Sequence, residues 1–449
     1  MTDCVAQYFR CPYRFVKLSL GDPQSGTREQ GRDGAVQPAD GPAISRLATG
    51  GGAFSETTLT DGKAALPFDL AHVVESLRYE QYAEASTQKS ALRTVINQVY
   101  YALRPFMPVA VRKHIQHLYL SRWKQRPFPH WPVDRTVDDL MKRSLLQSMK
   151  AAGVDRVPFI WFWPEGAPSC AIVTHDVETR AGRDYCKTLM DIDDSFGIKA
   201  SFQVVPEQRY EVPDDYLKSI TDRGFEVAVQ DLNHDGRLYQ DRKQFMARAA
   251  RINSYGRKWG SEGFRAAILY RRQEWFDALE FSYDMSVPNV AHLDPQRGGC
   301  CTVMPYFVGK ILELPVTATQ DYTLFHILND YSIDLWKRQI ELIMETNGLI
   351  SFIVHPDYIT EVRERSVYEA LLAYLAQLRK NEGIWIARPD HVNSWWRQRA
   401  TMELIEDADG LRIEGPGSER ARIAYATERG GQLVFTVQDG VQSSVSRQG

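Results

Sequence analysis

Residues 169–178 read SCAIVTHDVE, and this stretch decides the fold class. Its first part, residues 169–174, is a short apolar run of the kind that forms a buried parallel strand. Its second part carries three ionisable side chains, His175, Asp176 and Glu178, at the point where the strand would end. A structural turn rarely needs three such groups, so the sequence predicts a functional site at this strand end.

The apolar pattern of this first strand recurs along the chain that follows, with amphipathic stretches in between. Further strands are predicted at residues 199–205, 225–229, 263–267, 311–314, 349–354 and 384–387, and helices at 185–196, 214–223, 240–259, 273–279, 335–346 and 366–380. Short strands that alternate with helices indicate βαβ units and a parallel sheet. About seven repeats favour an α/β fold with a distorted (β/α) barrel of about seven parallel strands, in which functional side chains follow the carboxyl ends of the strands.

Composition divides the chain into five parts. These are a loosely ordered leader at residues 1–65, a helical region at 66–165, the barrel at 166–399, a small antiparallel β add-on at 400–440 and a frayed tail at 441–449. The helical region is predicted to contain helices at 69–82, 92–103, 109–124 and 136–150, the last with Thr136 and Asp138 near its cap. The add-on is predicted to contain strands at 402–405, 411–414, 422–426 and 433–437, separated by glycine-rich turns.

The predicted helix at 109–124 mixes basic and apolar residues, and two interpretations of it stay open. It could lie on an anionic membrane surface and give the protein a peripheral membrane contact. It could instead be a solvated helix that packs on the neighbouring domain, which is the interpretation that we favour.

The global numbers exclude some classes of protein. A net charge of −3 and a pI near 6.4 give no case for binding nucleic acid. The six cysteines show neither a CxxC pair nor zinc-knuckle spacing, which is typical of reduced thiols in a reducing compartment. The first residues lack the pattern of a signal peptide, and no apolar run is long enough to span a bilayer, so we expect a cytoplasmic protein. The sequence contains no indication of the oligomeric state.

Further polar side chains stand at the ends of three other predicted strands. They are Gln230, Asp231, His234 and Asp235 after the strand at 225–229, Arg265 on the next strand, and His355 after the strand at 349–354. Each has a structural interpretation when taken alone, since His234 could belong to a turn, Arg265 to an ion pair and His355 to a hydrogen-bonded strand end. Because several strand ends meet at one rim, we favour a site for general acid–base chemistry or for a metal.

The strand-end motifs resemble those of the polysaccharide deacetylases, the family with the NodB-homology domain, from about residue 168 to about residue 398. The matching segments stand in the family's order at 174–177 (THDV), 265–267 (RAA), 281–286 (FSYDMS), 312–315 (LELP) and 353–355 (IVH). The resemblance implies a metal-dependent amide hydrolase in which Asp176 is the general base, Arg265 holds Asp176 and His355 is the general acid. Asp321 follows a predicted strand, and we expect it to orient His355.

The metal-ligand set of that family is altered in this chain. The resemblance places ligands at three positions, which here hold Val177, Gln230 and His234, so that one of the three ligands remains. Local substitutes are Glu178, His175 and Asp231. We predict a divalent metal, zinc before a harder cation, at His234 with Glu178 or His175.

We expect other side chains at the rim to contact the substrate, namely Gln230, Asp231, Asp235, Arg297 and Tyr270. The predicted function is removal of an N-acyl (acetyl) group from an amino sugar of a polysaccharide or its precursor, with a glycan as the partner. One alternative is a catalytically silent glycan-binding scaffold of polysaccharide biosynthesis, which is indicated by Val177 and Gln230 at positions where metal ligands are expected. Another is a hydrolase of a non-sugar amide such as a cyclic imide.

Overall fold

The computed structural model of the chain describes residues 4–16, 18–20, 58–60, 63–83, 123–408 and 410–438. The predicted helix at 92–103, most of the predicted helix at 109–124, most of the leader and the predicted tail lie outside these residues. Within the described ranges, none of the helices combines the length and the hydrophobicity that crossing a bilayer requires.

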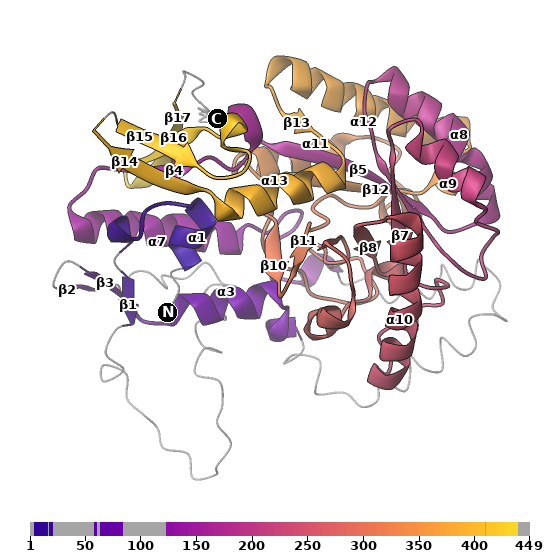
Figure 1. Cartoon of the computed structure of the whole chain (residues 1–449), viewed down its shortest axis with the longest axis horizontal. Coiled ribbons are helices and arrows are strands. Elements are labelled where there is room, and N and C mark those ends of the chain that lie inside the picture. Colours follow the sequence, from indigo (N-terminus) through magenta and orange to yellow (C-terminus); the bar gives the residue numbers. More distant parts are fainter. Residues whose placement is uncertain are drawn as a thin grey trace, which may run out of the picture.

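A nine-stranded sheet forms the centre of the structure (Figure 1). Its strands are β5 (Cys170–Val177), β6 (Ser201–Val204), β7 (Glu226–Gln230), β8 (Gly263–Arg265), β9 (Tyr283–Asp284), β10 (Tyr306–Val308), β11 (Ile311–Glu313), β12 (Leu349–Val354) and β13 (Trp385–Ile386). Hydrogen bonds join them in the order β10-β11-β9-β8-β7-β6-β5-β12, and β13 pairs with the first residues of β5. Within this sheet β10 pairs antiparallel with β11, and the other pairs are parallel.

The sheet curls, and the chain that follows β11 returns to β12. Val316 forms a parallel bridge with Pro288, and the backbone N–H of Ala318 donates to the carbonyl of Ser351 over 3.1 Å. These contacts bring the β11 side of the sheet against its β12 edge. The predicted distorted (β/α) barrel is therefore confirmed.

The pairing registers carry the strand ends to one rim. All eight residues of β5 and all six of β12 are buried, as expected for parallel strands that are covered on both faces. Val354 at the end of β12 lies opposite His175, and Gln230 at the end of β7 lies opposite Arg265. Side chains that follow these strands therefore start close together.

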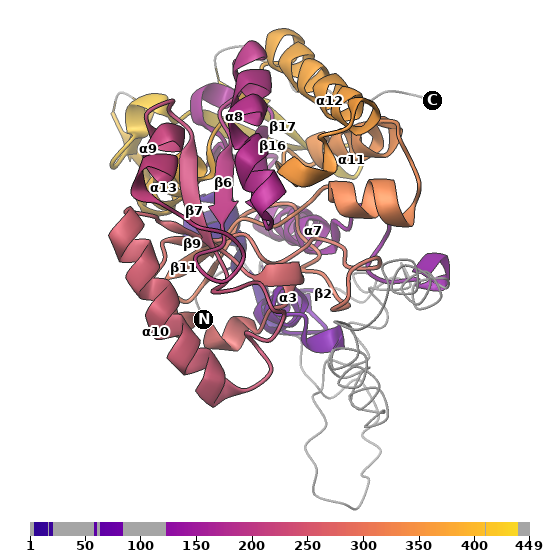
Figure 2. The ribbon, with the colours of Figure 1, turned by 90° about the vertical axis from the view of Figure 1, so that its right-hand side faces the viewer.

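Helices cover the outer side of the strands. They are α8 (Arg180–Ser195), α9 (Asp214–Thr221), α10 (Arg242–Trp259), α11 (Asp334–Met344), α12 (Val362–Asn381) and α13 (Pro389–Thr401). Figure 2 shows α8, α9, α11 and α12 outside the strands, where Leu189, Ile340 and Leu371 share one apolar core with the sheet. The segment predicted as a helix at 273–279 is a 3-10 helix, η7 (Gln273–Ala278).

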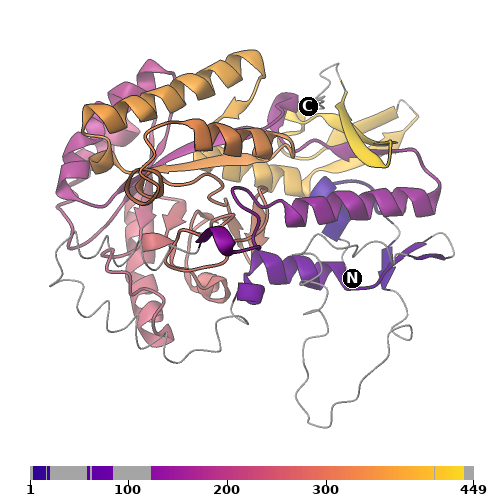
Figure 3. The same cartoon turned by 180° about the vertical axis from the view of Figure 1, so that it is seen from behind.

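Three helices from the N-terminal part of the chain form a layer beside the barrel. They are α1 (Cys4–Phe9), α3 (Leu70–Arg78) and α7 (Thr136–Ala152), and Figure 3 shows α3 and α7 next to each other. The prediction of a loosely ordered leader is wrong at its start, because Val5 and Phe9 are fully buried in a core that they share with α7.

Asp138 lies in the first turn of α7, as predicted, and also fastens this helix to the barrel. Its buried carboxylate accepts from Thr302 Oγ1 over 2.7 Å and from the backbone N–H of Val303 over 2.9 Å. The N-cap residue Arg135 makes no side-chain capping bond, but just before it Asp134 Oδ1 accepts from the N–H of Thr136 over 2.8 Å.

The C-terminal strands are joined to the rest of the fold more closely than predicted. β14 (Glu403–Asp407) and β15 (Gly410–Glu414) form a hairpin, and β16 (Ile423–Arg429) pairs antiparallel with β17 (Gln432–Val437). β16 also pairs with β4 (Arg156–Ile160), which precedes the barrel in the sequence. The predicted add-on therefore shares a sheet with a strand from the region in which only helices were predicted.

Candidate active site

The polar side chains at the carboxyl end of β5 point to two opposite faces of the sheet. Successive residues of a strand point to opposite faces, so Thr174, Asp176 and Glu178 share one side and His175 and Val177 the other. The contacts agree with this alternation. Asp176 meets side chains from β7 and β8, whereas Val177 packs in the core between the sheet and its helices.

Asp176 lies at the centre of the inner side and is held at both oxygens. Arg265 NH1 donates to Oδ1 over 2.5 Å, and Gln230 Nε2 donates to Oδ2 over 3.1 Å. The guanidinium is itself fixed, since NH1 also donates to Thr174 Oγ1 over 2.7 Å and Nε donates to the carbonyl of Met285 over 3.0 Å. Arg265 is fully buried and Asp176 nearly so, which makes this a desolvated and oriented ion pair.

Glu178 lies two residues after Asp176, on the same side of the strand, and faces two imidazoles. Its Oε1 is 2.6 Å from His234 Nε2 and 3.5 Å from His355 Nε2, and it accepts from Gln230 Nε2 over 3.2 Å. Burial favours the neutral carboxyl, but the charges of His234 and His355 outweigh burial and hold the pKa of Glu178 well below its ordinary value. In return, and against the effect of burial, Glu178 raises the pKa of His234.

His355 is oriented by Asp321 on its far side. Asp321 Oδ1 lies 2.6 Å from His355 Nδ1, and Oδ2 accepts the backbone N–H of the same residue over 2.6 Å. Although burial opposes the charged form, the carboxylates of Asp321 and Glu178 raise the pKa of His355 well above its ordinary value. The contact that the predicted role of Asp321 requires is thus present, and it leaves Nε2 directed toward Glu178.

His175 does not belong to this group, which corrects its prediction as a metal ligand. It is fully buried on the outer side of β5, where Nε2 lies 2.9 Å from Asp193 Oδ2 and Nδ1 lies 3.3 Å from the carbonyl of Val354. Tyr368 donates to the other oxygen of Asp193 over 2.5 Å. These contacts tie the end of β5 to α8 and α12 and turn the imidazole away from Asp176.

Two carboxylates expected to contact the substrate bind neighbouring groups of the chain, although Asp231 Oδ2 is buried without a hydrogen-bond partner. Asp231 is fully buried with a positive φ of 51°, and its Oδ1 accepts the next backbone N–H over 2.7 Å. Asp235 receives both terminal nitrogens of Arg248 at 2.7 Å each. Gly236 completes this turn with a φ of 73°, and a side chain at this position would meet Ile268 at 2.9 Å. The turn fixes the position of His234.

The other two residues expected to contact the substrate lie on loops of the barrel. Tyr270 follows a 3-10 turn after β8 and is partly exposed. Arg297 is also partly exposed and lies in a loop that is anchored near α3, because Glu80 Oε1 accepts from Gly299 N over 2.6 Å. Contact of Tyr270 or Arg297 with a substrate stays a prediction.

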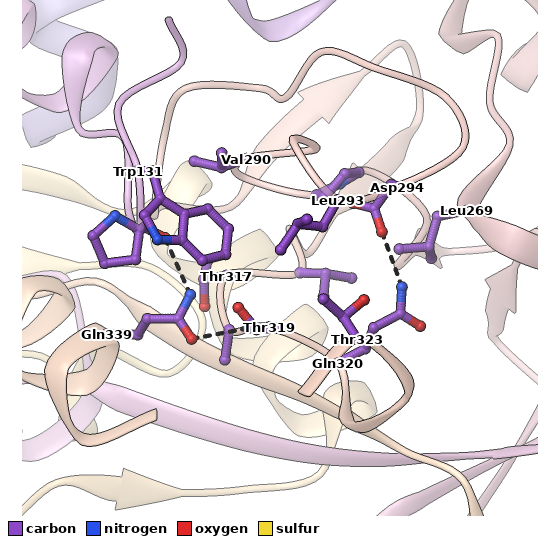
Figure 4. Close-up of a pocket in the computed structure, with 14 residues that line it drawn as sticks. Trp131, Leu269, Val290, Leu293, Asp294, Thr317, Thr319, Gln320, Thr323 and Gln339 are labelled. Atoms are coloured by element: carbon purple, nitrogen blue, oxygen red, sulfur yellow. Dashed lines mark hydrogen bonds between the residues drawn. The ribbon is translucent and has the colours of Figure 1, made fainter. Parts of the chain in front are cut away.

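A small cavity borders the segment that leads to Asp321 (Figure 4). Gln320 Nε2 donates to Asp294 Oδ1 over 3.0 Å across it, and the N–H of Thr319 donates to Gln339 Oε1 over 3.0 Å. Burial raises the pKa of Asp294 to about 6. Because these polar groups bind one another, the cavity wall holds the segment in front of Asp321 in place.

The residues of the inner side fit a divalent cation. Asp176, Glu178 and His355 each offer a ligand atom, and these three atoms lie within 4.8 Å of one another. His234 Nε2 and Gln230 Oε1 are buried without a hydrogen-bond partner, although the first lies beside Glu178. Rotation of the Gln230 amide by half a turn would direct its Oε1 at the same space. Oxygen and imidazole donors of this kind suit zinc and related ions.

The charges of the site are compatible with a divalent cation. Three carboxylates and one guanidinium leave two positive charges to be supplied; the groups are Asp176, Glu178, Asp321 and Arg265. Two protons, one on His234 and one on His355, would supply them, and so would one divalent cation beside neutral imidazoles. The site is therefore balanced in either state.

The barrel rim thus brings together an oriented carboxylate, an oriented imidazole and a group of side chains that could hold a metal, an arrangement compatible with acid–base or metal-assisted chemistry. No protein-family model matches the sequence, and a search of curated proteins finds no match.

Solved structures similar to this chain align with about half its length. A protein described as a polysaccharide deacetylase from Mycobacterium smegmatis is 18% identical with a TM-score of 0.43, over 53% of this chain and 93% of its own. An allantoinase is 13% identical with a TM-score of 0.41, over 52% and 92%. A family 4 acetyl xylan esterase from Clostridium thermocellum, solved with a cobalt ion, is 14% identical with a TM-score of 0.31, over 51% and 91%. At these identities the likeness concerns the fold alone.

Proposed function

We propose that this protein is a hydrolase of carbon–nitrogen bonds that removes an N-acyl group, acetyl before others, from an amino sugar of a polysaccharide or its precursor. The observation that carries this proposal is the pair of oriented groups on either side of Glu178. Asp176 is held by Arg265, and His355 is held by Asp321. A site that only bound glycan would need neither a fixed base nor a fixed acid.

The roles of the residues follow from their contacts. Asp176 would accept a proton from the attacking water, while Arg265 keeps the carboxylate in place. His355 would donate a proton from Nε2 to the departing amine, since its Nδ1 is bound to Asp321. The near-complete burial of these groups strengthens their electrostatic effect on the reacting atoms.

Glu178 and His234 would hold a divalent cation, zinc before others, together with Asp176 and the Gln230 amide. Such a cation supplies Lewis-acid polarisation of an acyl oxygen. Where the resemblance expects a metal ligand, this chain has Val177, whose side chain faces the outer core. Glu178 would replace that ligand, because its side chain lies on the same side of the strand as Asp176.

One observation favours a second candidate function, a catalytically silent module that binds glycan. Gln230 Nε2 donates to both Asp176 and Glu178, so that a neutral amide separates the two carboxylates where a cation could do so. If this arrangement is permanent, the site would bind a sugar without hydrolysing it.

Acetate release tests the choice between these functions. Metal-depleted protein is incubated with N-acetylated glucosamine oligomers, with and without added Zn²⁺ or Co²⁺, and acetate is measured. We expect release that Asp176→Asn lowers at least ~100-fold, whereas Asp155→Asn, at an exposed carboxylate, retains it. Absence of acetate release under every metal condition would refute the deacetylase, and ring opening of a cyclic imide without acetate release from the oligomers would move the substrate away from sugars.

A further inference from the structure

A carboxylate from the N-terminal layer is buried among the loops of the barrel. Glu80 lies two residues after α3, and both of its oxygens bind Arg271: Nε donates to Oε2 over 2.7 Å, and NH2 donates to Oε1. Oε1 also accepts from the N–H of Gly299 over 2.6 Å. Although burial opposes the charged form, Glu80 raises the pKa of Arg271 above its ordinary value. The N-terminal layer and two loops of the barrel therefore meet in one buried ion pair.

Arg271 closes a strained turn that follows Arg265 within a few residues. Ile268 and Leu269 both have positive φ angles, 60° and 54°, a conformation that is rare for bulky side chains. Arg271 NH1 donates to the carbonyl of Leu269 over 2.8 Å. Gln296 accepts from the backbone N–H of Arg271 and donates to its carbonyl, over 3.0 Å each. Strain of this kind persists only where surrounding contacts hold it, and it is concentrated at functional sites.

The same ion pair acts on the segment that leads to Asp321. Burial raises the pKa of Asp294 to about 6, and the charge of Arg271 opposes that rise. Asp294 Oδ1 accepts from Gln320 Nε2 over 3.0 Å, a contact that can be followed in Figure 4. Gln320 directly precedes Asp321, the carboxylate that orients the imidazole of the site. A series of interactions therefore leads from the ion pair toward the general acid.

We propose that Glu80 is a positioning residue of the candidate active site, which acts through Arg271 on the turn after Arg265 and on the segment before Asp321. This inference rests on the proposed function of the same site. It adds a requirement for the N-terminal layer, which lies outside the barrel, in the orientation of both the base and the acid.

The groups at the two ends of these interactions form short hydrogen bonds in the site. Arg265, which leads into the strained turn, binds Asp176 over 2.5 Å, and Asp321 binds His355 over 2.6 Å. Hydrogen bonds weaken steeply when their geometry is disturbed, and a displacement of about 1 Å can lower a catalytic rate about 100-fold. Loss of the ion pair would therefore act on the base and the acid together.

A double variant separates positioning from stability. Glu80→Gln alone leaves the charge of Arg271 buried and uncompensated, so we expect it to lower both the midpoint of urea unfolding and kcat. In Glu80→Gln/Arg271→Met neither charge remains, so the urea midpoint should return most of the way to that of the parent. The interactions of Arg271 with Leu269 and Asp294 stay lost. For acetate release with Zn²⁺ added, kcat should therefore remain about 10- to 100-fold below that of the parent, with little change in KM.

A second variant removes no charge. Gln296→Ala deletes the two hydrogen bonds to the backbone of Arg271, and we expect kcat to fall about 3- to 10-fold at a nearly unchanged urea midpoint. Glu345→Gln is the matched control. Its carboxylate binds Arg135 over 2.6 Å and so also joins the N-terminal layer to the barrel, but it precedes β12, whose opposite end leads to His355. This variant should keep the parental kcat.

Hydrogen–deuterium exchange follows the two segments without an assay of activity. In the double variant we expect faster exchange than in the parent over residues 266–271 and 318–322, and parental exchange over β12. In Glu345→Gln exchange over both segments should be that of the parent.

The outcomes separate this inference from the proposed function. A kcat that recovers together with the urea midpoint in the double variant would overturn the positioning role and leave the ion pair as a stabilising contact. Parental exchange over both segments in the double variant, or parental kcat and exchange in Gln296→Ala, would also overturn it while the hydrolase stands. Faster exchange over both segments, in a protein whose parent releases no acetate, would support the positioning of the loops by Glu80 and refute the hydrolase.

Discussion

Arg265 and Asp176 form the innermost ion pair of the site, with NH1 2.5 Å from Oδ1 and both side chains almost completely shielded from solvent. Removal of one partner of such a pair leaves an uncompensated buried charge. We expect Arg265→Met to lower the free energy of unfolding by about 3–5 kcal/mol, measured by urea denaturation. The double variant Asp176→Asn/Arg265→Met should recover part of this loss. A double variant that is destabilised by the sum of the two single changes would contradict the coupling.

Metal binding should depend on His234 and not on every histidine. We expect metal-depleted protein to take up about one equivalent of Zn²⁺, and His234→Ala or Glu178→Gln to lower the affinity at least ~10-fold. His391→Ala is the matched control, because this imidazole is exposed and lies beside Arg388. Elemental analysis after dialysis and calorimetry measure both quantities, and equal metal content in His234→Ala would exclude this ligand.

His175→Ala should separate stability from metal binding. The substitution leaves Asp193 buried without its imidazole, so we expect a loss of about 3 kcal/mol or more in the free energy of unfolding. The zinc content of the folded fraction should stay that of the parent, because His175 lies on the outer side of β5. Loss of metal at unchanged stability would restore His175 as a ligand.

Asp321→Asn should act on catalysis through His355. The amide cannot accept at both oxygens as the carboxylate does, and it removes a charge that raises the pKa of His355. We expect kcat to fall about 10- to 100-fold with little change in KM. Because the acid must be protonated to act, the alkaline limb of the pH–rate profile should move to lower pH. A profile that keeps its position at reduced kcat would indicate a purely structural role.

Glu226 should make the protein less stable as pH rises. Burial, together with the charge of Asp390, raises the pKa of Glu226 to about 8, and Tyr283 donates to its carboxyl. The unfolded chain releases this proton near pH ~4.3, so between that value and about 8 the folded state binds more protons than the unfolded state. The free energy of unfolding should therefore fall with pH by up to about 1.4 kcal/mol per unit.

Glu226→Gln removes the proton that this carboxyl binds and should flatten the dependence of stability on pH. Urea midpoints at pH 5, 6, 7 and 8 compare this variant with the parent. Glu382→Gln, at an exposed position, is the control and should follow the parent. An equal slope in Glu226→Gln and in the parent would show that other groups cause the decline.

The apolar runs of the sequence predicted the barrel well because a buried parallel strand is continuous in hydrophobicity. They did not predict β9 and β10, which have only two and three residues. They also did not predict β4, a five-residue strand in a region where the other apolar patterns indicate helices. Short strands such as Tyr283–Asp284 exist through their neighbours, and their own pattern is too brief to identify them.

At the site, residue order predicted which strands contribute but not the direction of every side chain. Strand alternation alone separates His175 from Asp176 and Glu178, and applied strictly it would have excluded His175 as a ligand. Asp321 was harder to place, because it follows a loop and lies just before a π-helical turn, not on a strand. Such contacts depend on how the chain after β11 crosses to β12, which local sequence does not contain.

The pairing of β16 with β4 limits how early this protein can finish folding during its synthesis on the ribosome. Ile423 must be made before it can lie opposite Ile160, more than 250 residues earlier. At synthesis rates of about 5–20 residues per second, the nascent β4 waits for roughly 10–60 seconds with its apolar side chains unpaired. During that interval the apolar side chains of β4 lack the strand that pairs with them in the native fold, and a chain truncated before residue 423 is expected to be prone to aggregation.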